Sequence, residues 1–110
     1  MTSAAPFSGG APIATYTATA IGAEATAYTV SGAAKRVVVT GLAIAVSAAC
    51  SVQFLDGTGG AIKIQVPLLA INTPFVLDLG EGIVLTAGNN LRVISSAAAN
   101  LSGMVFGRET

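Results

Sequence analysis

Residues 51–66, SVQFLDGTGGAIKIQV, decide the fold of this chain. The first half alternates Val52 and Phe54 with polar residues, which is the period of a half-buried strand. Asp56–Gly60 is a strong turn signal, since glycine adopts the backbone angles that tight turns need. The second half alternates again, and we expect its apolar residues to face inward: Ile62, Ile64 and Val66. The stretch therefore predicts a β-hairpin, which we expect Pro67 to end.

The same period of two recurs on both sides of the hairpin. Further strand-like segments are residues 14–20, 25–30, 35–47, 75–79, 83–85, 91–95 and 100–109. Turn residues separate these segments, and none fits helical spacing better than alternation. The chain is therefore predicted to be all-β, forming a single antiparallel β-sandwich or jelly roll of about eight short strands.

Residues 35–47 contain a change of face. Val37 and Val39 share one parity, Ile44 and Val46 share the other, and Gly41 lies between them. A β-bulge at the glycine explains such a switch. The predicted core combines the inward positions of all the strands: Val39, Ile44, Val46, Phe54, Ile64, Leu77, Leu85, Val93 and Val105.

The N-terminal segment differs from the rest in composition. Residues 1–13, MTSAAPFSGGAPI, are small and interrupted by proline and glycine. We expect a flexible arm over residues 1–13 and a sandwich domain over residues 14–110. The arm has no basic residue and no continuous apolar run, so it does not predict a signal peptide.

Charge is scarce in this chain. Hydrophobic residues make up 53% and charged residues 9% of its 110 residues, and the five basic and five acidic side chains cancel. A surface with so little charge favours association with other protein chains. Scattered basic residues without a basic face argue against binding to nucleic acid.

The residues that carry most enzyme chemistry are missing. The chain has no histidine, and its single cysteine, Cys50, lies in an apolar run where we expect it to be buried. Asp78 and Glu81 flank a Gly80–Gly82 turn, where capping of the backbone is the expected role. The loop Asp56–Gly60 lacks the lysine of a phosphate loop. We therefore expect no catalytic residues, no metal site, no cofactor and no enzymatic activity.

One stretch allows a different interpretation. Residues 37–55 form a run of 19 uncharged residues after Lys35 and Arg36, which is close to the length of a transmembrane helix. Five polar or glycine residues interrupt the run, and three valines open it. We therefore expect strands and no membrane insertion, with a membrane-inserted chain as the third hypothesis.

Four stretches of the C-terminal half form a recognisable pattern: Phe75–Leu79 (FVLDL), Gly82–Gly88 (GIVLTAG), Asn90–Val93 (NLRV) and Leu101–Gly107 (LSGMVFG). In this pattern the chain resembles small β-sandwich virion proteins of tailed bacteriophages, and the resemblance covers about residues 50–109. Similar sequence patterns occur in trimeric jelly rolls of the tumour-necrosis-factor type. The Ala- and Thr-rich segment from Ala14 to Ala34 departs from the pattern.

The resemblance implies a capsid decoration, or cement, protein of the virion. Such a chain is made in the host cytoplasm, forms a homo-oligomer (a homotrimer is expected), and binds the major capsid protein on the outside of the phage head. As a hypothesis, the arm provides the capsid-docking residues: Pro6, Phe7, Pro12 and Ile13. The alternative is a receptor- or glycan-binding jelly-roll module of a phage tail or fibre, which needs an exposed aromatic and polar pocket.

Overall fold

The computed structural model describes the backbone of residues 11–18 and all of residues 22–110. This part of the chain contains strands and no helix. The strands are β1 (Ala11–Ala18), β2 (Ala25–Tyr28), β3 (Val37–Val46), β4 (Cys50–Asp56), β5 (Ala61–Leu69), β6 (Phe75–Val84), β7 (Leu91–Ser95) and β8 (Leu101–Glu109).

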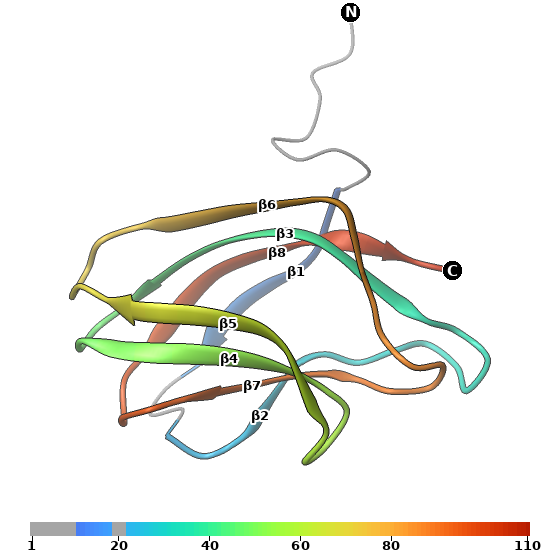
Figure 1. The fold of residues 1–110 in the computed structure, drawn as a ribbon, viewed down its shortest axis with the longest axis horizontal. Coiled ribbons are helices and arrows are strands. Elements are labelled where there is room, and N and C mark those ends of the chain that lie inside the picture. The colour runs from blue at the N-terminus through green and yellow to red at the C-terminus, as the bar shows by residue number, and fades with distance from the viewer. Residues whose placement is uncertain (1–10, 19–21) are drawn as a thin grey trace, which may run out of the picture.

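The strands form two four-stranded sheets that pack face to face (Figure 1). Sheet A has the order β1-β8-β3-β6, and sheet B has the order β2-β7-β4-β5. All paired strands are antiparallel, and the first strand pairs with the last, the second with the seventh, the third with the sixth and the fourth with the fifth. This nested pairing is that of an eight-stranded jelly roll. The predicted fold class is confirmed.

The core lies between the two sheets and contains the inward-facing side chains of both. Eight of the nine predicted core residues are buried, and the ninth, Leu77, is partly buried and packs against the others. Phe54 is the largest fully buried side chain. Its place on β4, between β5 and β7, puts it at the centre of sheet B.

The predicted bulge in β3 is present. The pairing of β3 with both β6 and β8 shifts register between Val39 and Gly41. Val39 and Leu42 consequently both reach the core although they differ in parity. The extra residue of the bulge is Thr40, which is buried.

The hairpin of β4 and β5 is also present, with two corrections. Ile62 was expected to face inward but is 51% exposed, because a register shift between Phe54 and Leu55 pairs Ile62 with Leu55 and changes its face. Pro67 does not end the strand, which continues to Leu69. The strand lies at the edge of sheet B, where the missing N–H of a proline costs no ladder hydrogen bond.

The predicted boundary between arm and sandwich needs adjustment. β1 begins at Ala11, three residues before the expected start, so Pro12 and Ile13 belong to a strand that pairs with β8. The other two residues proposed for capsid docking, Pro6 and Phe7, lie outside the described residues.

Residues 37–55, which have the length of a transmembrane helix, instead form β3, a short turn and most of β4. Within residues 11–18 and 22–110, the structure contains no helix long and apolar enough to cross a membrane.

Cys50 begins β4 and is buried, as expected. Burial raises the pKa of its thiol, so the reactive thiolate is scarce. We expect no labelling of the native chain by a thiol reagent and one equivalent of labelling in denaturant. Thr58→Cys places a second thiol on the exposed β4–β5 turn and serves as the control, which should label natively at one site. Rapid labelling of the unmodified chain would show that Cys50 is accessible.

Candidate interaction surface

β6 is an apolar strand that the fold does not bury. Six of its ten residues are large and apolar, yet none is fully buried. The neighbouring strand β3, by contrast, is buried at most positions. Phe75, Leu77 and Leu79 pack against the core with one part of their surface and remain partly exposed with the rest. Sheet B therefore covers the inner face of β6 incompletely.

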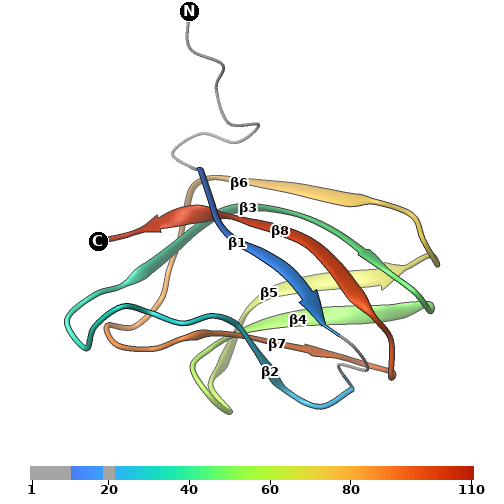
Figure 2. The same ribbon diagram turned by 180° about the vertical axis from the view of Figure 1, so that it is seen from behind.

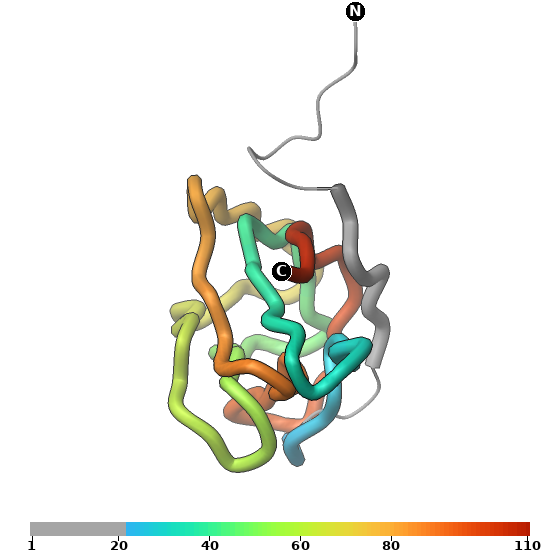
Figure 3. The backbone as a smooth tube through the Cα atoms, turned by 90° about the vertical axis from the view of Figure 1, so that its right-hand side faces the viewer, coloured from blue at the N-terminus to red at the C-terminus, as the bar shows by residue number. Residues whose placement is uncertain are grey.

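The edge strands β1 and β2 lie along one side of the sandwich (Figure 2). The other two edge strands, β5 and β6, lie together along the opposite side (Figure 3). We call the surface formed by β5, β6 and their connection the β5–β6 side. The large hydrophobic residues exposed between residues 22 and 110 are Ile62, Leu68, Ile71, Val76, Val84 and Met104. Five of these six lie on the β5–β6 side, and Leu68 is 72% exposed. Exposed large apolar side chains that are concentrated on two edge strands and their connection are typical of a protein–protein interface.

The sixth residue extends the β5–β6 side onto the outer face of sheet A. Met104 of β8 pairs with Ala43 of β3, which pairs in turn with Val76 of β6. Residues directly opposite one another in register project from the same face of a sheet. The three side chains therefore form an uncharged row across sheet A that ends at the β5–β6 side.

A wide bulge bends β6 and separates its two halves. Gly41 pairs with Asp78 and Val39 pairs with Ile83, so Leu79, Gly80, Glu81 and Gly82 stand opposite Thr40 alone. This is where the sequence predicted a turn. Gly82 has φ 105°, and a Cβ there would lie 2.7 Å from Cγ1 of Val38. Only glycine fits this position.

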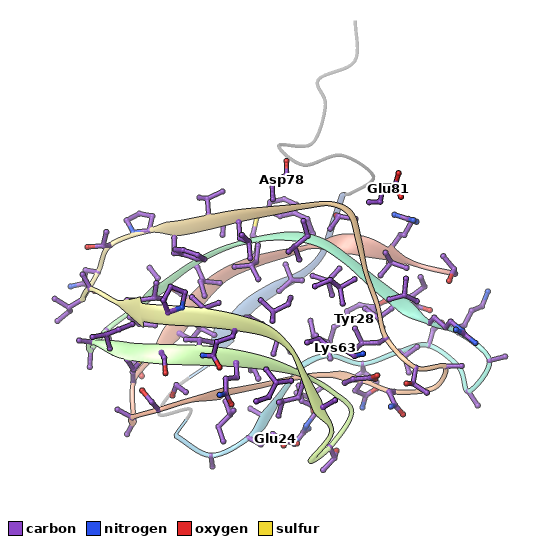
Figure 4. All side chains as sticks on the ribbon, in the orientation of Figure 1. Glu24, Tyr28, Lys63, Asp78 and Glu81 are labelled. Atoms are coloured by element: carbon purple, nitrogen blue, oxygen red, sulfur yellow. The ribbon has the colours of Figure 1, made fainter. Side chains whose placement is uncertain are left out.

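One of the two carboxylates near this bulge, that of Asp78, caps the backbone as expected. Oδ1 of Asp78 accepts a hydrogen bond of 2.8 Å from the N–H of Gly80. Glu81 and Asp78 are both exposed and point outward from β6 (Figure 4). Among residues 22–110, no group of three or more Cys, Asp or Glu side chains is placed to hold a metal ion.

One end of the sandwich is held by a buried carboxylate. Asp56, at the end of β4, accepts hydrogen bonds from the N–H and Oγ1 of Thr86 at 3.1 and 2.8 Å, and from Nδ2 of Asn89 at 3.0 Å. The β4–β5 turn is thereby tied to the β6–β7 connection. Burial raises the pKa of Asp56, but the hydrogen bonds from Asn89 and Thr86 and the positive charge of Lys63 lower it by more, and the net shift is downward.

Two more carboxylates link distant strands. Glu24 pairs with Arg92 of β7 at 2.7 Å, and this hydrogen bond is the main reason that the pKa of Glu24 is lowered. Glu109 of β8 accepts hydrogen bonds from Ser31 and from the hydroxyl of Tyr28, and both lower the pKa of Glu109. The second of these hydrogen bonds also raises the pKa of Tyr28. Tyr28 also packs against the core.

These shifts predict how stability depends on pH. The carboxyl groups of Glu24, Asp56 and Glu109 have pKa values below the ordinary range of about 4. Their contribution to the stability of the folded chain is therefore complete above that range and is lost as pH falls through the folded-state pKa values. Tyr28 has a raised pKa, so its contribution is present below about pH 10 and is lost at higher pH. We expect the melting temperature to be constant between about pH 5 and 9 and to fall outside these limits.

Thermal unfolding followed by circular dichroism from pH 2 to 11 measures this dependence. Asp56→Asn is the control, because it removes one titrating carboxyl; the variant should be less stable at pH 7 and lose less stability on acidification. A melting temperature that rises as the solution is acidified would contradict the assignment.

A shallow hollow of about 100 Å³ lies on the outer face of sheet B. It is lined by Ser51, Gln53, Ile94, Ser95 and Ser96. Nε2 of Gln53 donates a hydrogen bond of 2.8 Å to Oε1 of Gln65 beside it. No aromatic side chain lines this hollow, although a glycan site commonly combines polar groups with a ring.

Neither comparison of the sequence with known protein families and curated proteins, nor comparison of the fold with solved structures, finds a match.

The β5–β6 side was not anticipated from the sequence. The alternation in Phe75–Leu79 reads as an ordinary half-buried strand, and Leu77 was placed in the core. The position of β6 at the sheet edge, which leaves its apolar residues open to solvent, depends on the strand order. The available signal was the density of apolar residues from Leu68 to Val84 without a basic residue among them.

Proposed function

We propose that this chain is a structural virion protein of a tailed bacteriophage, a capsid decoration protein that binds the outside of the phage head as a homo-oligomer. The observation that carries the proposal is β6, in which none of ten residues is fully buried although six are large and apolar. Such a strand needs a protein neighbour to exclude water.

The jelly-roll topology and the scarcity of charge support the same proposal. Jelly rolls occur in viral capsid domains as well as in lectins and cupins. With 9% charged residues the chain has few groups to keep a large free surface soluble. The proposed partners are further copies of the chain, as a homotrimer, and the major capsid protein; catalysis, cofactors, nucleic acid and membranes have no part in the proposal.

Cryo-electron microscopy of phage particles made with and without the gene for this chain tests the function. The proposal expects extra density on the outer surface of the head that disappears without the gene. Density at the tail or a fibre would support the alternative, a receptor- or glycan-binding module that uses the hollow on sheet B. Particles that are identical with and without the gene would contradict both.

The N-terminal segment is the proposed anchor on the capsid. Residues 2–10 precede β1 and include Pro6 and Phe7. Because the sandwich strands begin at Ala11, deleting residues 2–10 should leave the circular dichroism spectrum unchanged and abolish co-sedimentation with particles that lack the protein. Binding at full strength by the truncated chain would place the docking surface on the sandwich instead.

A further inference from the structure

The two edge strands of the β5–β6 side carry opposite charges. Lys63 of β5 and Asp78 and Glu81 of β6 are all exposed. Figure 4 shows the two carboxylates pointing outward from β6 and Lys63 coming from β5, in the other sheet. The ion pair found among residues 22–110 joins Arg92 to Glu24, so these three side chains form none within their own chain.

This arrangement suits contact between identical chains. β6 is an edge of sheet A and β5 is an edge of sheet B, and both lie along one side of the sandwich. A rotation axis that runs parallel to the strands beside this surface places β6 of one copy next to β5 of the other. The positive charge of Lys63 then comes close to the negative charges of Asp78 and Glu81 on the other copy, and the apolar residues of β5 come close to those of β6.

We propose that the chain packs against a second copy of itself through the β5–β6 side, with β6 of one copy beside β5 of the next and Lys63 facing Asp78 and Glu81 across the contact. This inference rests on the proposed assembly and specifies its surface. Each copy presents β6 to one neighbour and β5 to the other, so each contact joins two different surfaces. Such a heterologous contact closes into a ring when the rotation permits.

An alternative interpretation is that Lys63 and Pro67 prevent the edge strand β5 from pairing with strands of other chains, as charges and prolines often do. The exposed Leu68, Ile71 and Val76 beside them argue for a covered surface, since a protected edge has no need of three large apolar side chains in solvent.

Exchange of the two charges tests the contact. Asp78→Asn first removes the second carboxylate, so that Lys63 faces Glu81 alone. In this background Lys63→Glu and Glu81→Lys each place like charges across the proposed contact, and the double variant restores opposite charges. By sedimentation velocity at micromolar concentrations, we expect each single variant to associate about tenfold or more weakly than the Asp78→Asn chain, and the double variant to recover to within about threefold. Arg36→Glu is the control, because it makes the same charge change as Lys63→Glu outside β5 and β6 and should associate normally.

The inference is overturned if the single variants associate like the Asp78→Asn chain, if the double variant does not recover, or if the unmodified chain is monomeric. A single cooperative thermal transition in each variant confirms that the variants are folded. Particle binding is measured separately. A chain that assembles through the β5–β6 side but adds no density to phage heads would contradict the proposed function and leave this contact standing.

Discussion

Gly103→Ala should prevent the chain from folding normally. Gly103 lies in the middle of β8 and pairs with Ile44 of β3. Its φ of 145° is disfavoured for other residues, and a Cβ there would lie 2.0 Å from the carbonyl oxygen of Ala43. This neighbour is backbone at the centre of sheet A, so relief requires separation of β3 and β8. We expect a loss of stability above about 4 kcal/mol, seen as an unfolded or aggregated chain by circular dichroism and sedimentation.

Gly59→Ala provides the matched control for this substitution. Gly59 also has a positive φ, 63°, but a Cβ there would meet no atom within 4 Å. The variant should lose only about 1–2 kcal/mol, the cost of a left-handed backbone for alanine. If Gly103→Ala were as stable as Gly59→Ala, the close pairing of β3 with β8 would be wrong.

Phe54→Ala should cost about 3–5 kcal/mol, the range for removal of a large aromatic side chain from a packed interior. Phe54 is completely buried and pairs with Ile64 on one side and Val93 on the other. Denaturant unfolding at pH 7 measures the loss as a shift of the midpoint at constant slope. Ile62→Ala is the control: its side chain is half exposed, and we expect a change below about 1 kcal/mol. Equal losses in the two variants would contradict the register of β4 and β5.

Local patterns predicted the core and the turns because both depend on neighbouring residues. The alternation around Phe54 and Ile64 placed them inside, and Gly41 marked the bulge at the change of face. The position of Ile62 was predicted wrongly because a bulge between Phe54 and Leu55 shifts the register, and nothing in the residues themselves marks it.

The candidate interaction surface depends on long-range pairing and was therefore harder to predict. The scarcity of charge indicated that some surface is covered by protein, without indicating which. β6 became the candidate only when the strand order placed it at an edge, with its apolar residues half covered by sheet B. The opposite charges of Lys63 and Glu81 lie 18 positions apart in the sequence, and their complementarity follows from two edge strands that share one side.

We propose that this chain functions by assembling with copies of itself, and sedimentation velocity of the unmodified chain at micromolar concentration measures this assembly. We expect a single species with the mass of an oligomer, a trimer by the expectation from the resemblance, which dissociates on dilution or on substitution within the β5–β6 side. A monodisperse species with the mass of one chain, 10.8 kDa, across the whole concentration range would contradict it.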